Sequence, residues 1–360
     1  MDDCRILRDS FPQWGAAIPA PNLIVGGGGG GGHTVAYDKV GRARHIILNW
    51  NDGFNFRLNA ELPEAIGRMS SLYILHMNDH RIYGSIPSTF GELHSLRELC
   101  LSGNNLSGPL PDALCRLTNL EILDLHDNDF SAPLPSEIGR LTKLTILRLN
   151  NNNITGSISR DIGRISGLQQ LYLGHNRMEG EIPKSIGKLS KLELLQLQHN
   201  KLTGQIPTEL GQIKCLKFLF LNSNRLIGEL SDSMFSNFKH LEYLLLNRNQ
   251  FSGNIPQSLL NLKQIQILLV NLHYGNLNFL IIQATITDDS ITTTLTPCQE
   301  RNFHFLSSWA CSWGSKKSWF ALKEQECLPS WLFLSTQSFL LTCFTPLITS
   351  LPNATVAAIA

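Results

Sequence analysis

The 360-residue sequence lacks a charge excess, and this absence limits the kinds of partner it can bind. Thirty basic and 29 acidic residues give a formal net charge of +1. Binding to a phosphate backbone requires a marked basic excess on one face of a protein. We therefore do not expect nucleic acid as a partner.

Signals for export and for disulfide formation are also missing. The N-terminus begins MDDCRILRDS, with two acids and no apolar run of the kind that a secretion signal needs. The eight cysteines are scattered and form no CxxC pair and no zinc-binding spacing. No disulfide framework is implied. These features favour a cytoplasmic location, with a membrane location as the alternative.

Motifs of the common enzyme classes are absent as well. The sequence has no GxSxG, no HExxH, no phosphate-binding loop and no kinase HRD or DFG motif. Cys100 and His76 could pair as a nucleophile and its base, but such a pair also needs an orienting group and an oxyanion site. We therefore predict no catalytic residues and no cofactor.

What the sequence does contain is an internal repeat with the frame LxxLxLxxNxLxGxIP. Its Asn recurs at a constant interval, which is longer by a single position only at the last step. The series consists of Asn104, Asn128, Asn152, Asn176, Asn200, Asn224 and Asn249. One period before Asn104 the equivalent position is His80, and one period after Asn249 it is His273. Atypical end copies are expected, because a terminal repeat has a neighbour on one side only.

Each residue type in the frame has a physical role. Alternating leucines lie on one side of a short strand, and each fully buried Leu contributes about 1.5–3 kcal/mol. An Asn side chain both donates and accepts, so it can satisfy backbone groups in its own turn and in the next. The Gly after it supplies a backbone conformation that other residues resist. The frame therefore predicts stacked coils with a buried Asn ladder.

The LxGxIP half of the frame resembles the plant-type subclass of leucine-rich repeats, as in plant receptor ectodomains and polygalacturonase inhibitors. The resemblance covers roughly residues 46–273. It implies an α/β, right-handed leucine-rich-repeat solenoid with short parallel strands on its concave face, a ligand surface there and no catalytic residues. Secreted members usually begin with a Cys-paired cap, whereas here only Cys4 precedes Cys100.

Three regions are predicted on this basis. Residues 1–33 form an N-terminal segment that ends in a glycine run (26–32), interpreted as a flexible linker. Residues 34–275 form the solenoid, with about eight full repeats. Residues 276–360 form a hydrophobic tail that we expect to be disordered or the product of an imperfect gene model. Within it, Trp331 to Ile348 has the minimum length of a membrane-spanning helix but contains many polar residues.

Candidate ligand-binding residues lie on the concave face, between the two leucines of each strand. The column that points outward there reads His76, Cys100, Asp124, Arg148, Tyr172, Gln196, Phe220 and Leu245. Clustered aromatic side chains on a rigid platform are typical of binding hot spots. We hypothesise that Tyr172, Phe218, Phe220 and Tyr243 anchor a protein or peptide ligand, with Arg148 and Gln196 beside them. The alternative is that the Phe218 column packs partly inside, because it also contains Ile122, Ile146 and Leu194.

Two further groups receive a simpler interpretation. His175 and His199, in adjacent turns, could share a metal or sense pH, but the column offers no third ligand. Asp124, Asp127 and Asp129 are spaced as in a calcium loop, but the Gly and terminal Glu of that loop are missing. We interpret both groups as ordinary strand ends and predict no metal.

Two functions are consistent with these observations. The first is an intracellular scaffold that binds a protein or peptide on the concave face. The second is a membrane-anchored or secreted receptor or hydrolase inhibitor that binds a peptide or glycan.

Overall fold

The computed structural model describes residue 3 and residues 34–38, 40, 42–49, 57–274, 277–287 and 290–297. The glycine run, the rest of the N-terminal segment up to residue 33 apart from residue 3, and the Trp331 to Ile348 segment lie outside these residues, so expectations about them stay predictions. Among the described residues, no helix has the length and apolar character needed to cross a bilayer.

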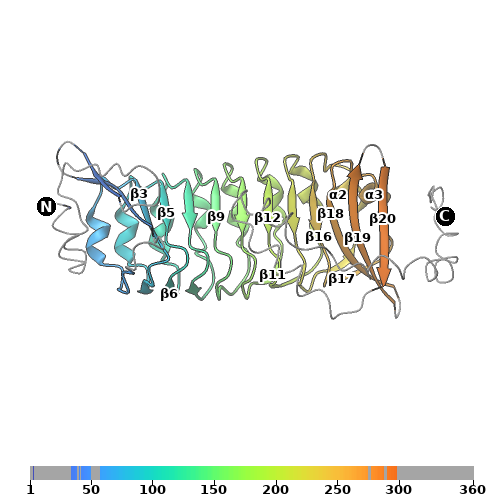
Figure 1. Cartoon of the computed structure of the whole chain (residues 1–360), viewed down its shortest axis with the longest axis horizontal. Helices are drawn as coiled ribbons and strands as arrows, with labels where there is room; N and C mark the ends of the chain where they lie inside the picture. Colours follow the sequence, from blue (N-terminus) through green and yellow to red (C-terminus); the bar gives the residue numbers. More distant parts are fainter. Residues whose placement is uncertain are drawn as a thin grey trace. The chain divides into compact units, whose positions relative to one another are not determined.

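One side of the repeat array is a sheet to which each turn contributes a strand (Figure 1). Its parallel strands follow one another in chain order: β2 (Ala43–Asn49), β3 (Ile74–Asn78), β5 (Glu98–Cys100), β7 (Ile122–Asp124), β9 (Ile146–Arg148), β10 (Gln170–Tyr172), β12 (Leu194–Gln196), β14 (Phe218–Phe220), β16 (Tyr243–Leu245) and β18 (Ile267–Tyr274). This order confirms the predicted α/β solenoid.

Antiparallel strands lie at both ends of this sheet. β1 (Thr34–Tyr37) pairs with β2 at the first end. At the other end β18 pairs with β19 (Leu277–Thr287), which pairs in turn with β20 (Ser290–Pro297). The last two strands fall in the region 276–360, after the repeat frame has stopped. They extend the sheet without extending the repeat.

The chain returns between sheet strands through one short helix per turn. These helices are η2 (Glu64–Arg68), η3 (Ser88–Glu92), η4 (Asp112–Arg116), η5 (Ile138–Arg140), η6 (Arg160–Arg164), η7 (Lys184–Lys188), η8 (Thr208–Gln212), α2 (Asp232–Phe235) and α3 (Gln257–Leu260). Most begin directly after the Pro of the frame, whose fixed φ suits the start of a helix.

A second set of short strands follows the Asn of each turn, and it was not foreseen from the sequence. β4 (Tyr83–Gly84), β6 (Asn105–Gly108) and β8 (Asp129–Phe130) form one group, and β11 (Glu179–Glu181) and β13 (Lys201–Thr203) form a second. β15 (Ile227–Glu229) pairs with β17 (Gln250–Ser252), which joins the main sheet through β18. Their signal in the sequence is the recurring xLxG segment, which alternates as a strand does.

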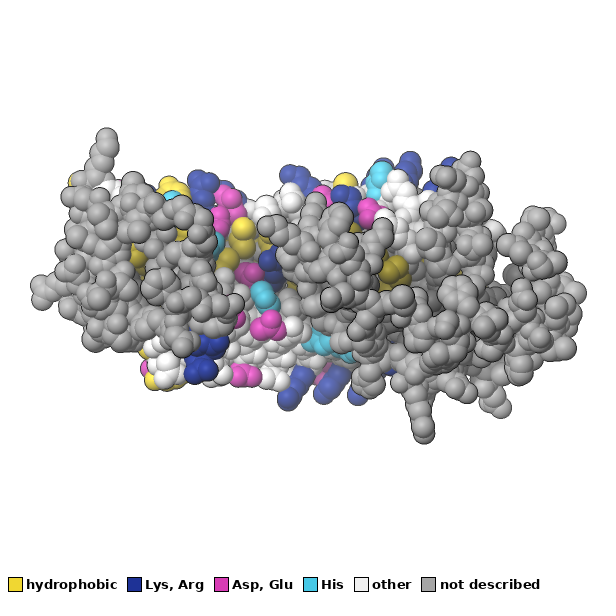
Figure 2. All heavy atoms as spheres, viewed as in Figure 1, with side chains coloured by type: hydrophobic (Ala, Val, Ile, Leu, Met, Phe, Trp, Pro, Cys, Tyr) yellow, Lys and Arg dark blue, Asp and Glu magenta, His cyan; other side chains and the backbone are white. Residues whose placement is uncertain are grey.

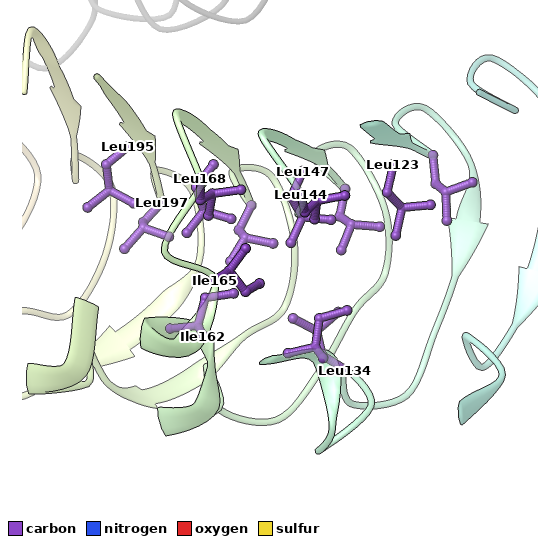
Figure 3. Close-up of a cluster of buried hydrophobic side chains, with 14 of the residues drawn as sticks. Leu123, Leu134, Leu144, Leu147, Ile162, Ile165, Leu168, Leu195 and Leu197 are labelled. Atoms are coloured by element: carbon purple, nitrogen blue, oxygen red, sulfur yellow. The ribbon is translucent and has the colours of Figure 1, made fainter. Parts of the chain in front are cut away.

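Leucines of the frame fill the interior of the coil. Leu123, Leu147 and Leu195 are at most 1% exposed, and Leu144 and Leu168 belong to the same cluster (Figure 3). This core runs without interruption from Val35 to Val270. Each turn buries its apolar side chains against the turns before and after it, so the turns are stable only as a stack.

The repeated Asn residues form a ladder of hydrogen bonds between turns. The Oδ1 atom of Asn152 accepts from the backbone N–H of Phe130 in the preceding turn at 3.0 Å. Its Nδ2 atom donates to the carbonyl oxygens of Leu125 and Leu149 at 3.1 and 3.2 Å. The other six Asn make the same kinds of contact. The ladder thus satisfies backbone groups that have no sheet partner.

Two positions in the frame restrict the residue that can occupy them. Gly156 has a φ of +71° and lies against Pro133 of the preceding turn, so a side chain there would be both strained and crowded. Ala132 occupies the equivalent position one turn earlier with a φ of +71°. Gly163, in η6, lies so close to the next turn that a Cβ atom would overlap the carbonyl oxygen of Ser185.

The turn that carries α2 is longer by a single residue than the turns on either side of it. The starts of η7, η8 and α2 are equally spaced along the chain. The distance in sequence from β14 to β16, however, is one residue longer than that from β12 to β14. The additional residue therefore lies on the return side, near α2. The register of the sheet is unchanged, with Phe218 opposite Tyr243 and Phe220 opposite Leu245. The return side absorbs the insertion.

Candidate binding surface

The concave surface of the sheet is built from two columns of outward-facing side chains. Strand register places one residue of each column opposite its equivalent in the next turn, as for Tyr172 and Gln196 or Gln196 and Phe220. Successive residues in a column are therefore about 4.8 Å apart. The two columns contain Glu98, Ile122, Ile146, Gln170, Leu194, Phe218, Tyr243 and Ile267, and Cys100, Asp124, Arg148, Tyr172, Gln196, Phe220, Leu245 and Leu269.

The earlier half of this surface contains a network of charged side chains centred on Asp124. Arg148 donates from Nη1 to Asp124 Oδ2 at 3.2 Å, and His126 Nδ1 lies 2.5 Å from Asp124 Oδ1. Burial opposes ionisation of Asp124, but the hydrogen bond and charge of His126 together with Arg148 hold its pKa below the ordinary value. Burial likewise opposes protonation of His126, but Asp124 outweighs it and raises the pKa of His126. The network therefore favours a carboxylate paired with an imidazolium.

Tyr172 belongs to this network and not to the aromatic residues beyond it. The Arg148 guanidinium lies 5.1 Å from the centre of the Tyr172 ring, and Tyr172 Oη donates to Gln170 Oε1 at 3.1 Å. Burial raises the pKa of Tyr172, while the charge of Arg148 lowers it in part. Gln196 separates Tyr172 from Phe220 in the column.

The later half of the surface contains an aromatic cluster, which we define as Phe218, Phe220 and Tyr243. The rings of Phe218 and Tyr243 are stacked, with centroids 5.1 Å apart and planes at 22°. Phe218 meets Phe220 edge-on at 6.4 Å and 61°. Tyr243 Oη donates to Gln266 Oε1 at 2.7 Å, and burial raises the pKa of Tyr243 to about 12. Three of the four predicted anchor residues are thus brought together.

The exposure expected for this cluster is wrong for two of its members. Phe220 is 2% and Tyr243 is 3% exposed. Neither side chain belongs to the continuous core of the coil, however, and Phe218 is half-buried. The alternative that the Phe218 column packs partly inside stays a prediction, with Tyr243 of that column buried and Phe218 half-buried. They lie on the concave side of the sheet and are screened from solvent in this structure.

The candidate nucleophile Cys100 has a raised pKa. Burial, and then the nearby charges of Asp124 and Glu98, raise the pKa of the Cys100 thiol to about 12. His76, its neighbour in the column, is 2.9 Å from Glu98 Oε2 through Nε2. A thiol of this pKa is protonated at neutral pH and is a poor nucleophile.

The other candidate ligand groups are occupied by contacts within the solenoid. The rings of His175 and His199 stack with centroids 4.2 Å apart, and burial lowers the pKa of His175. Asp127 accepts from Asn151 Nδ2 at 2.6 Å, and Asp124 is paired with Arg148. In the part of the chain that the structure describes, no three His, Cys, Asp or Glu side chains are grouped so that they could hold a metal ion.

The pairing of Asp124 with His126 was not predicted from the sequence. Both residues belong to one strand and its exit, two positions apart, so their side chains lie on the same face. That spacing was the available signal.

Comparisons with known proteins agree with this architecture. A family model described as a leucine-rich repeat region matches residues 53–161, and one described as a leucine-rich repeat matches residues 167–189, 191–213 and 240–262. A search of curated proteins gives no match.

Several solved structures resemble the chain. The leucine-rich-repeat ectodomain of the plant membrane receptor kinase GASSHO1/SCHENGEN3 from Arabidopsis thaliana, solved in complex with CASPARIAN STRIP INTEGRITY FACTOR 2, is 35% identical with a TM-score of 0.59, over 62% of this chain and 26% of that one. The ectodomain of the Arabidopsis receptor kinase HAESA, in complex with an IDA peptide hormone, is 28% identical with a TM-score of 0.61, over 73% and 44%. The PEPR1–AtPEP1 structure is 27% identical with a TM-score of 0.59, over 74% and 44%. The chain thus spans less than half the length of each of these structures.

Proposed function

Because this chain is a leucine-rich-repeat protein of the plant type, we propose that it is a recognition module that binds a peptide or a segment of a protein on the concave face of its sheet. Two of the solved structures that it resembles are complexes, one of them with a peptide hormone. Catalysis forms no part of the proposal.

The aromatic cluster is the observation that carries the proposal. Phe218 contacts both Phe220 and Tyr243 on the adjacent strands β14 and β16, and the sheet register fixes their backbone positions. Large, rigid side chains on a stiff platform lose little freedom when a ligand binds, so more of the contact energy appears as affinity. Of the two polar residues expected beside the cluster, Gln196 is only 5% exposed and Arg148 is paired with Asp124.

The test uses the full chain and a displayed library of random peptides. Peptides selected on the wild-type protein are measured against the variant F220A/Y243A and against Y83A. Tyr83 is an aromatic residue on β4, outside the concave face, and is 44% exposed. Loss of two hot-spot side chains is expected to raise the dissociation constant at least about 30-fold, whereas Y83A should bind as the wild type does.

Unfolding of F220A/Y243A in urea provides the control for a general loss of structure. Both residues are buried but lie outside the continuous core of the coil, so the cooperative transition should be retained at a lower urea concentration. Selected peptides that bind F220A/Y243A as tightly as wild type would refute the aromatic site.

The second candidate function is that of a secreted or membrane-anchored receptor or inhibitor, which binds a peptide or glycan outside the cell. It is favoured by the similarity to ectodomains of membrane receptors, which gives no support to the cytoplasmic location expected from the sequence. Asn105, in the sequon Asn105-Leu-Ser107, is exposed on β6.

Expression of the tagged chain in plant cells separates the two locations. A secreted or anchored protein should shift in mobility after glycosidase treatment, and the shift should decrease in the variant N105Q. A product of unchanged mobility in the soluble cell fraction would instead support an intracellular scaffold.

A further inference from the structure

A row of cations borders the concave face in four consecutive turns, the last two of which contain the aromatic cluster. We define it as the basic strip: Arg177, Lys201, Arg225 and Arg248. The first three are exposed and Arg248 is half-buried. Figure 2 shows Lys and Arg side chains along both the upper and the lower edge of the array, with Asp and Glu side chains among them. The stacked His175 and His199 lie in the same turns, next to the ladder Asn.

The position of the strip is fixed by the repeat itself. Arg177, Lys201 and Arg225 each directly follow a ladder Asn. In each case the backbone N–H donates to a carbonyl oxygen of the preceding turn at 2.8 Å, to Ile154, Met178 and Leu202 respectively. The three cations therefore start from equivalent backbone positions about 4.8 Å apart.

These cations lack the acidic partners that other surface cations of the solenoid have. Arg97, Arg116 and Arg140 form ion pairs with neighbouring glutamates at 2.9–3.4 Å. Within the described residues, the structure shows no ion pair for any member of the strip. Glu179 is opposite Lys201 in the register of β11 and β13, but its carboxylate is not paired with that lysine. Stacked unpaired charges of one sign repel one another, so an anionic partner would relieve an unfavourable interaction.

Charge changes sign along this margin of the solenoid. The positions that flank the ladder Asn are Asp127 and Asp129 in an early turn, Asn151 and Asn153 in the next, and then the histidines and the strip. The net charge of the chain is only +1, so the strip is a local feature. Arg225 and Arg248 lie in the turns of the aromatic cluster, whereas Arg177 and Lys201 lie in the turns of Tyr172 and Gln196.

We propose that the basic strip binds carboxylates of an acidic, amphipathic segment of the protein ligand whose apolar side chains contact the aromatic cluster. This inference rests on the proposed function and specifies the chemistry of its ligand. A segment that meets both surfaces must carry acidic and apolar side chains together. A peptide has both, whereas an acidic polysaccharide has carboxylates but no large apolar side chains.

The spacing of the strip indicates the conformation of such a segment. Side chains on one face of an extended peptide recur about every 6.6–6.8 Å, whereas one turn of an α-helix advances about 5.4 Å. The helical value is closer to the distance of about 4.8 Å between turns of the solenoid. Long Lys and Arg side chains can accommodate the remaining difference over three turns. A helix with one carboxylate per turn is therefore the best match.

The experiment measures binding of two synthetic helical peptides to the full chain. One carries Glu on one face and Leu and Phe on the other, and its counterpart carries Gln in place of Glu. The strip variant is R177Q/K201Q/R225Q. The control variant, R116Q/R140Q/R164Q, removes the same number of charges from η4, η5 and η6.

The strip variant is expected to bind the Glu peptide about tenfold more weakly than wild type at low salt, because three ion pairs of modest strength are lost. The control variant should bind as wild type does. Raising the salt concentration should weaken binding of the Glu peptide to wild type and have little effect on the Gln peptide. Equal affinity of the strip and control variants, or no measurable binding of the Glu peptide to wild type, overturns the inference.

Two further outcomes separate this inference from the proposed function. If both peptides lose affinity for F220A/Y243A but the strip variant binds normally, the aromatic site stands and the inference fails. If a uronate polysaccharide binds wild type but not the strip variant, while the Glu peptide binds neither, the ligand is a glycan and the inference fails. Binding that requires the strip but is unchanged by F220A/Y243A supports the strip and refutes the aromatic anchor.

Discussion

The adjacent residues Asn152 and Asn153 permit a direct test of the ladder. Asn152 is 8% exposed, and its side chain bonds to the backbone of Phe130, Leu125, Leu149 and Asn150. Among the described residues, the structure shows no hydrogen bond to the Asn153 side chain. Replacing each by Ala removes the same atoms from the same turn. The difference in the free energy of unfolding between the two variants therefore measures the ladder contacts alone.

The size of this difference depends on which backbone groups lose their last hydrogen-bond partner when Asn152 is replaced. The carbonyls of Leu125 and Leu149 each keep a bond, from Asn128 and Asn176 respectively. The backbone N–H of Phe130, which is 0% exposed, loses its hydrogen bond to the ladder. An unpaired buried donor costs about 1–3 kcal/mol, and each lost but replaceable bond about 0.5–1.5 kcal/mol, so we expect N152A to lose about 3 kcal/mol.

The measurement is urea unfolding of the full chain followed by circular dichroism. N153A should lie within about 0.5 kcal/mol of wild type, as substitutions away from key contacts usually do. A difference between the two variants below about 1 kcal/mol would show that water or a rearranged turn replaces the Asn, and would refute the argument for the ladder.

Three other predictions concern local features. Ala132 has a φ of +71°, so A132G should raise the free energy of unfolding by about 1 kcal/mol in the same assay; a decrease would contradict the strain argument. The raised pKa of His126 stabilises the folded chain below the unfolded value near 6.5, and this stabilisation is lost as pH rises through the folded pKa. The lowered pKa of Asp124 stabilises the folded chain above the ordinary carboxyl value, and that stabilisation is lost as pH falls. The pH dependence of unfolding above about pH 6.5 should therefore be weaker in H126Q than in wild type, and an unchanged profile would exclude this pair as its source. The buried Cys100, with its pKa of about 12, should resist iodoacetamide at pH 8 while the exposed Cys215 reacts, as peptide mass spectrometry would show; equal labelling would contradict the raised pKa.

The features that repeat were predictable from the sequence, because a fixed period places equivalent residues of neighbouring turns in contact. The Leu123 and Leu147 positions, the Asn ladder and the stacked columns all follow from that period. The contact between Phe218 and Tyr243 also follows, since both occupy one column in adjacent turns.

Features that depend on side-chain conformation or on non-repeating segments were not predictable. Tyr172 shares a column with Phe220, but its ring lies against Arg148. A column gives the direction of a side chain but neither its rotamer nor what covers it, and so the low exposure of Phe220 was not foreseen. β19 and β20 follow the end of the repeat, where no period indicates a partner strand.

The longer turn has a consequence for how such a protein can change. An additional residue near α2 leaves Phe218 opposite Tyr243, so the sheet and the return side tolerate length changes independently. Insertions and deletions on the return side could therefore accumulate, or be engineered as sites for grafted loops and tags, without moving a single residue of the recognition columns. Specificity could then evolve by substitution on one side of the coil, while variation in length is confined to the other.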